Sequence, residues 1–120
     1  MSVRAALLLC FMTLLAGCVT SGNVDPMSTS KGRADARQAY VQLGVGYLQQ
    51  GQTERAKVPL KKALELDDSD ADANAALALV FQVEMESELA DKHFQKALSA
   101  RNGDARILNN YGSFLYEQKR

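Results

Sequence analysis

Large apolar residues and small residues recur along this chain at a fixed spacing of 34 positions between Tyr40 and Tyr116. At this offset the small residue Gly44 falls on Ala78 and Gly112. The other aligned sets are Leu43 with Leu77 and Tyr111, Tyr47 with Phe81 and Leu115, Ala56 with Ala90, Leu60 with Phe94, Ala63 with Ala97, and Leu64 with Leu98. A repeat of this length predicts helical hairpins that pack on one another, because a single hairpin leaves its apolar face exposed.

The order of leucine, glycine, tyrosine and alanine within each unit resembles the tetratricopeptide repeat. Two complete units fit, 37–70 and 71–104, and residues 105–120 supply the first helix of a third. The resemblance implies an all-α fold of hairpins stacked as a short right-handed solenoid. The departures are Tyr40, Asn74 and Leu108 at the usual tryptophan position, and Asp68 and Asn102 at the usual proline position. The alternative is a set of unrelated amphipathic helices that match by chance.

Turn and capping residues place the boundaries of the predicted helices. The first helix is expected to run from about Ala34 to Gln50, after which Gly51 allows a left-handed turn. A weaker turn is expected after the third helix, where Met85 replaces the glycine. Pro59 is expected to bend its helix slightly without breaking it. The residues predicted as N-caps are Thr53, Asp70, Ser87 and Asp104.

Residues 1–17 have the pattern of a lipoprotein signal peptide. Arg4 supplies positive charge, and the apolar run that follows is too short to cross a bilayer as an ordinary anchor. The run ends in Leu-Ala-Gly-Cys, with Cys18 last, which resembles the bacterial lipobox. In that motif small residues precede a cysteine whose thiol receives diacylglycerol and which becomes the mature N-terminus. The alternative is a conventional signal peptide with an incidental cysteine.

Residues 18–33 are predicted to be a lipidated cysteine followed by a flexible tether, because Ser, Thr, Gly, Asn and Pro are frequent there. Acyl chains on Cys18 would hold the chain at a membrane, since each buried methylene contributes about 0.8 kcal/mol. The next residue is Val19. Aspartate at that position retains many bacterial lipoproteins in the inner membrane, so the sequence favours the outer membrane, with the repeats facing the periplasm.

The sequence contains no recognisable constellation for catalysis or metal binding. The formal net charge is zero at pH 7, and no basic cluster indicates nucleic acid. The segment from Asp67 to Asp72 imitates a calcium loop, but Ala73 and Leu79 replace the glycine and glutamate that such a loop requires. His93 is the single histidine and is expected to be solvated or lightly packed. We therefore predict a binding protein that is not an enzyme and uses no metal, cofactor or small-molecule substrate.

Stacked helical hairpins curve, and the first helix of each repeat lines the concave surface. Nine residues are expected there as a partner groove: Val41, Val45, Leu48, Leu79, Gln82, Val83, Asn109, Ser113 and Tyr116. Five of the nine are aliphatic and none is charged, so the groove would suit an apolar or amphipathic segment. The alternative is that Val45 and Leu48 pack against the tether or a neighbouring helix.

The whole chain resembles the N-terminal half of the type IV pilus biogenesis/stability lipoproteins, the PilF/PilW pilotin family. The matching segments are residues 17–22 (Gly-Cys-Val-Thr-Ser-Gly), 40–48 (Tyr-Val-Gln-Leu-Gly-Val-Gly-Tyr-Leu), 56–60 (Ala-Lys-Val-Pro-Leu), 108–112 (Leu-Asn-Asn-Tyr-Gly) and 114–120 (Phe-Leu-Tyr-Glu-Gln-Lys-Arg). Members of this family are outer-membrane lipoproteins. The resemblance implies that the chain binds the secretin, the pore for the pilus, and promotes its localisation and multimerisation.

The chain departs from that family in length, because it stops after one helix of the third repeat. We expect a fragment or a prematurely ended reading frame. Two other functions remain open. One is a general envelope scaffold that recruits cell-wall enzymes or outer-membrane assembly factors, and the other is an enzyme whose active residues lie in a further C-terminal part.

Overall fold

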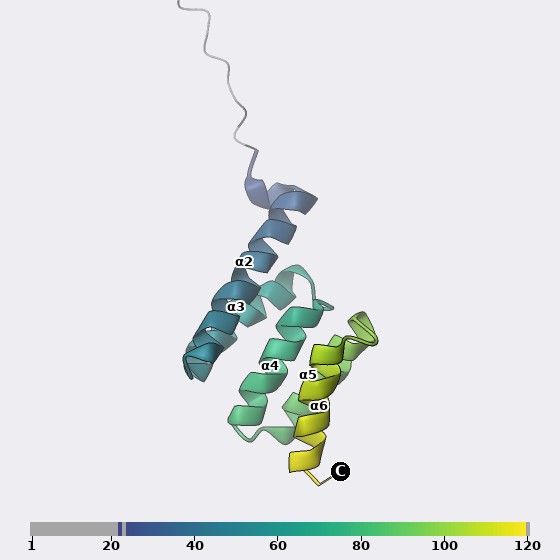
Figure 1. Ribbon diagram of the computed structural model, residues 1–120. Helices are drawn as coiled ribbons and strands as arrows, with labels where there is room; N and C mark the ends of the chain where they lie inside the picture. The colour runs from purple at the N-terminus through teal and green to yellow at the C-terminus, as the bar shows by residue number, and fades with distance from the viewer. Residues whose placement is uncertain (1–21, 23, 120) are drawn as a thin grey trace, which may run out of the picture.

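The computed structural model describes residues 22 and 24–119. All regular structure in these residues is helical, as the 34-residue pattern predicts. The elements are the 3-10 helix η1 (Pro26–Ser28) and the α-helices α2 (Ser30–Gln49), α3 (Thr53–Leu66), α4 (Ala71–Val83), α5 (Ser87–Ala100) and α6 (Ala105–Glu117). Helices α2 and α3 form one hairpin, α4 and α5 form the next, and α6 lies beside the second hairpin (Figure 1).

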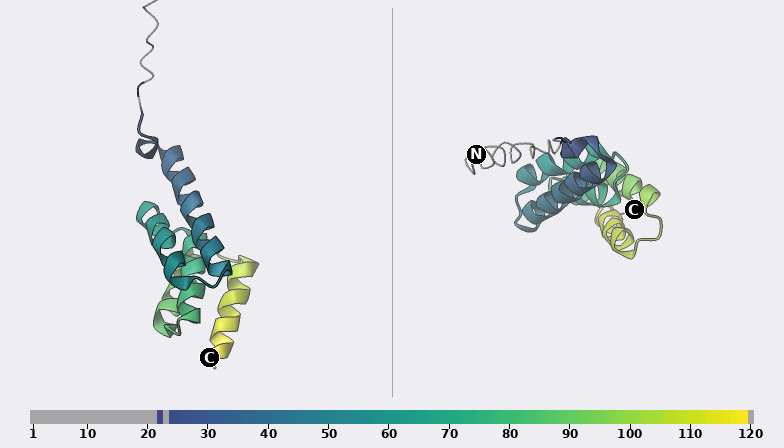
Figure 2. Two further views of the ribbon diagram at one scale, coloured as in Figure 1. Left: turned by 90° about the vertical axis from the view of Figure 1, so that its left-hand side faces the viewer. Right: turned by 90° about the horizontal axis from the view of Figure 1, so that it is seen from above.

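The N-terminal turns of α2 project beyond the end of α3 (Figure 2). This helix was expected to begin near Ala34, after a flexible tether. It begins at Ser30 instead, because the hydroxyl oxygen of Thr29 accepts a hydrogen bond from the Gly32 amide, 2.9 Å away. The short helix η1 folds back against this start of α2. The tether prediction is therefore wrong for residues 26–33, which are largely helical.

The two complete hairpins turn through residues with a left-handed backbone. Gly51 has a φ of 73°, which confirms the predicted turn after α2. Met85 takes the same place after α4 with a φ of 62°, a conformation that is unfavourable for a residue with a Cβ atom. The Met85 residue is 87% exposed, so packing does little to compensate for this strain.

Aspartates cap the first helices of the second and third repeats. Asp70 Oδ1 accepts a hydrogen bond of 2.8 Å from the Ala73 amide at the start of α4. Asp104 Oδ1 accepts one of 3.2 Å from the Ile107 amide at the start of α6. This backbone hydrogen bond is the main cause that lowers the pKa of the Asp104 carboxyl. Both predicted caps are confirmed, and they fix where two of the repeats begin.

The prediction that Thr53 and Ser87 are N-caps is wrong. Each is the first residue of its helix, and the preceding residues, Gln52 and Glu86, are the N-caps without any side-chain capping hydrogen bond. The second helices of the repeats are thus positioned by packing and by the preceding turn. Pro59 lies inside α3, which continues past it without a break, as expected.

Small residues keep the helices close together. Ala56 and Ala90, which share one place in the repeat, are both 0% exposed. Gly44 lies so near Leu60 that a Cβ atom on the glycine would be 2.4 Å from Leu60 Cγ. The other predicted packing residues that are buried are Ala63, Leu77, Ala78, Phe81, Phe94 and Ala97, and Tyr47 is half-buried. Small residues therefore lie where the helices approach most closely, and large residues fill the space beside them, as the repeat pattern predicts.

Two residues that were expected to pack between helices do not. Leu43 is 50% exposed, whereas its counterpart Leu77 is 1% exposed, because no α-helix precedes α2 in the described chain. Gly112 is exposed, and nothing lies within 4 Å of the place where its Cβ atom would be. No helix follows α6 in the described residues to approach this glycine. Leu43 and Gly112 lie at the two ends of the described stack. Inside a stack, the faces that carry these positions are covered by a neighbouring repeat, whereas at these two ends they are open.

In the second repeat the buried polar residue Asn74 stands where the usual tryptophan would be, and it pairs with the half-buried His93. Asn74 is 0% exposed, and its amide nitrogen donates to the backbone carbonyls of Asp68 and Asp70. Its side-chain oxygen lies 2.9 Å from Nδ1 of His93, which therefore carries the proton of this hydrogen bond. The His93 ring stacks on Phe81 with 5.4 Å between centroids, and burial lowers its pKa. The histidine thus has a structural role that the sequence did not reveal.

Candidate partner-binding surface

The structure does not assemble the predicted concave groove as an apolar surface. Val41 is 8% exposed and packs with Ala63 and Ala73, so it is not available to a partner and this prediction is wrong. The aliphatic residues Val45, Leu48 and Leu79 are half-buried against the main core cluster. For Val45 and Leu48, packing against neighbouring helices is the alternative that the sequence left open.

The other predicted groove residues are open to solvent to differing degrees. Val83 and Tyr116 are 65% and 85% exposed. Gln82 is partly exposed and donates a hydrogen bond of 2.7 Å to Glu117 Oε2. Asn109 and Ser113 are exposed polar residues on α6. Because polar side chains separate the two exposed apolar ones, this face lacks a continuous apolar surface, and a partner groove here stays a prediction.

A different hollow, open and largely apolar, lies between α2 and α3. Its volume is about 240 Å³, and we call it the first-repeat pocket. The residues that line it are Tyr40, Leu43, Tyr47, Arg55, Val58, Pro59 and Lys62. Two aliphatic side chains in it remain in contact with water, since Leu43 is 50% and Val58 is 59% exposed. Exposed aliphatic residues gathered in a hollow are typical of a protein-binding surface.

Two cations lie at the rim of the first-repeat pocket, each over an aromatic ring. The guanidinium carbon of Arg55 is 5.8 Å from the centroid of the Tyr47 ring. The Lys62 ammonium is 5.7 Å from the centroid of the Tyr40 ring. Cation–π contacts of this length hold the charges beside the aromatic floor. An apolar floor with a positive rim favours a partner segment that carries both apolar and acidic side chains.

The sequence reasoning missed this pocket because it assigned Leu43 and Tyr47 to packing between helices. That assignment is correct inside a stack, where the preceding repeat covers these positions. The first unit of any stack leaves the same positions open. The sequence signal was an apolar Val58 on the second helix, which aligns with Lys92 in the next repeat.

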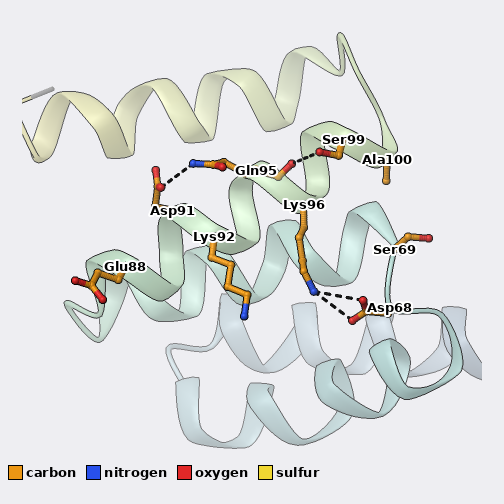
Figure 3. Close-up of a pocket in the computed structure, with 9 residues that line it drawn as sticks. All are labelled: Asp68, Ser69, Glu88, Asp91, Lys92, Gln95, Lys96, Ser99 and Ala100. Carbon is orange, nitrogen blue, oxygen red and sulfur yellow. Dashed lines mark hydrogen bonds and ion pairs between the residues drawn. The ribbon is translucent and has the colours of Figure 1, made fainter.

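A larger polar pocket of about 540 Å³ is lined by α5 and the loop between α3 and α4 (Figure 3). Within it, Lys96 lies 3.3 Å from the Asp68 carboxylate, and the Gln95 amide donates a hydrogen bond to Asp91. Throughout residues 22 and 24–119, no group of three or more His, Cys, Asp or Glu side chains is placed to hold a metal ion. This pocket therefore presents no feature that points to a ligand, and the first-repeat pocket is the stronger candidate site.

No family model matches this chain. Its sequence is 63% identical over 120 residues to the type IV pilus assembly protein PilF of Pseudomonas aeruginosa, a match that covers 100% of this chain and 48% of PilF. A solved structure from a functional characterisation of Pseudomonas aeruginosa PilF superposes with a TM-score of 0.72 and 67% identity. That superposition covers 74% of this chain and 40% of the solved one. The chain is a relative of PilF.

A second relative is an uncharacterised protein of Haemophilus influenzae, 31% identical over 102 residues. That match covers 85% of this chain and 57% of the relative. The chain thus spans about half the length of the curated relatives that it matches. The alignment with PilF covers the entire chain, so the positions that line the first-repeat pocket lie within the aligned region.

The predicted lipidation site, Cys18, lies outside the described residues. Among the helices that the structure does describe, none combines the length and apolar character needed to span a membrane.

Proposed function

We propose that this chain acts in type IV pilus biogenesis as a pilotin, a lipoprotein that binds the pilus secretin and promotes its localisation and multimerisation in the outer membrane. The observation that carries the proposal is the 63% identity to PilF, a type IV pilus assembly protein, over all 120 residues. The lipobox resemblance around Cys18 supports the membrane anchor, and the tetratricopeptide hairpins support a binding role.

The first-repeat pocket is the surface that we propose for the secretin. Leu43 and Val58 keep about half of their surface in water, and burial of the remainder would contribute about 2 kcal/mol in total. The aromatic rings of Tyr40 and Tyr47 add large, rigid contact area of the kind that dominates protein interfaces. A segment held there would move with the lipid anchor, because α2 connects the pocket directly to the N-terminal part of the chain.

The substitution Leu43→Glu tests the pocket. It places a charge on the apolar floor, and we expect it to weaken capture of the secretin from solubilised membranes by about tenfold or more. Because Leu43 is 50% exposed, the melting temperature should stay unchanged. The matched control is Leu108→Glu on α6, where the leucine is 47% exposed but lies outside the pocket. Equal capture by both variants would remove the pocket from the proposal.

The same capture experiment separates the pilotin from a general scaffold. A pilotin recovers the secretin as its main partner, and the Leu43→Glu variant loses it. A scaffold recovers cell-wall hydrolases or outer-membrane assembly factors. Recovery of these proteins by the unaltered chain, without secretin, would contradict the proposed function.

The substitution Cys18→Ala tests the anchor. Without the thiol no diacylglycerol can be attached, so we expect the repeats to fold but to be recovered from the soluble periplasmic fraction. Secretin multimers should then accumulate mainly in the inner membrane, as membrane fractionation would show. Multimers that still reach the outer membrane in normal amounts would exclude anchoring from the mechanism.

A further inference from the structure

The first-repeat pocket lies on one face of the first repeat. In the second repeat, the equivalent face is covered by another helix of the chain. The two faces correspond at the 34-residue spacing: Leu43 with Leu77, Tyr47 with Phe81, Pro59 with His93, and Lys62 with Lys96. Leu77 is 1% exposed, whereas Leu43 is 50% exposed. The difference arises because α3 lies on the second face, while no α-helix of the described chain lies on the first. The second repeat is therefore a template for an occupant of the pocket.

Helix α3 shows which side chains fit this face. Leu60 is 0% exposed in the core cluster that contains Leu77, and Leu64 lies against the same cluster. Just beyond the end of α3, Asp68 pairs with Lys96 across the junction at 3.3 Å (Figure 3). Positions 60 and 64 are four residues apart, which places them along one stripe of α3, and Asp68 follows after the helix has ended. The covering segment thus presents two apolar residues and then an acid.

We infer that the first-repeat pocket takes an amphipathic α-helix of its partner, which lies on the first repeat as α3 lies on the second. The helix carries two apolar residues four positions apart and is followed, just beyond its end, by an acidic residue that pairs with Lys62. This inference rests on the proposed function, since it takes the pocket to be the site where the secretin binds.

The backbone chemistry of the pocket favours a helix over an extended segment. All regular structure around the pocket is helical, so there is no sheet edge whose amides and carbonyls could pair with an extended chain. A helix satisfies its own backbone groups, whereas an extended segment on an apolar floor would leave several of them without partners. The cations Arg55 and Lys62 at the rim complement an acidic side chain at the edge of such a helix.

The probe for this inference is a fluorescent peptide of residues 53–69 of this chain, stapled as a helix on the side away from its leucines. Fluorescence anisotropy with the full chain in detergent micelles measures its binding. We expect saturable binding that Leu43→Glu weakens by about tenfold and that Leu108→Glu leaves unchanged. An unstapled peptide with Leu64→Pro, which cannot complete the helix, should not bind. No binding of the stapled peptide, or equal binding by the proline variant, would overturn the inference.

A charge exchange tests the acidic position. We expect Lys62→Asp in the chain to weaken the stapled peptide by about threefold, the size of an exposed ion pair. The stapled peptide that carries Asp68→Lys should recover the lost affinity when it binds the Lys62→Asp chain, and it should not bind any other form of the chain more tightly. If it does not, the acidic part of the inference is wrong.

The two proposals fail in different ways. Loss of secretin capture by Leu43→Glu, together with no binding of the stapled helix, overturns the helix and leaves the secretin site in place. Binding of the stapled helix at Leu43, together with unchanged secretin capture by Leu43→Glu, supports the helical occupant and overturns the secretin as that occupant.

Discussion

A single missing methyl group at residue 44 sets the distance between α2 and α3. Gly44 is buried, and the position of its absent Cβ atom lies 2.4 Å from Leu60 Cγ, closer than two carbon atoms can approach. Leu60 is 0% exposed and lies in the main core cluster, where close packing restricts its movement. Gly46, two residues further along α2, has no atom within 4 Å of its own Cβ position. These two glycines therefore have different physical roles in one helix.

We predict that Gly44→Ala destabilises the chain by about 1–3 kcal/mol, because the new methyl group overpacks the contact with Leu60. Gly44→Leu should unfold the first repeat. The matched control Gly46→Ala should instead stabilise the chain by about 0.5–1 kcal/mol, since alanine favours the helix and meets no neighbour. Urea unfolding followed by circular dichroism measures both. Equal effects of the two substitutions would show that the contact does not limit the helix spacing.

At the scale of the elements, the two complete hairpins have the same turn but different residues in it. Gly51 adopts its φ of 73° without strain, whereas Met85 adopts a φ of 62° with its side chain 87% exposed. We predict that Met85→Gly raises the free energy of unfolding by about 1 kcal/mol, because it relieves the left-handed strain. The converse change, Gly51→Met, should lower it by a similar amount. Thermal melts measure both, and a melting temperature lowered by Met85→Gly would contradict the assignment.

The sequence predicted the helices and their order well, because burial repeats with the period of the hairpin. It failed where a local hydrogen bond overrides the pattern. The Thr29 hydroxyl starts α2 at Ser30, inside a stretch whose composition is typical of a tether. Thr53 and Ser87 looked like caps by residue type, but each lies one position inside its helix. Propensity gives the preferred residue of a cap, but it does not fix the position at which the helix begins.

At the scale of the whole molecule, the candidate site depends on which faces of the stack are covered. The sequence placed a groove on the concave side by assuming that the first helices expose their inner residues. In the described chain Val41 is instead buried with Ala63 and Ala73, where two repeats meet. The open apolar face lies at the start of the stack, around Leu43 and Val58. The 34-residue period identifies equivalent positions in each repeat. It does not say in which repeat these positions are covered by a neighbouring helix.

The stability of the whole stack should depend on pH through His93, the single histidine of the chain. The ring lies where α3, α4 and α5 meet, and Asn74 Oδ1 accepts its Nδ1 proton. Burial is the main cause that lowers its pKa from 6.5, and the positive charges of Lys96, Lys92 and Lys61 act in the same direction, against the opposing charge of Asp68. The folded state therefore resists a second proton that the unfolded chain accepts.

The sign of the effect follows from proton linkage. Well above pH 6.5, His93 is neutral in both states and the full stability is present. As the pH falls below that value, the unfolded chain binds the proton first, so the free energy of unfolding decreases until the folded pKa is passed. We predict a lower melting temperature at about pH 5.5 than at about pH 7, a range in which carboxylates stay charged. His93→Gln, whose amide can still donate to Asn74, should remove this dependence, and a slope that persists in the variant would assign the effect to other groups.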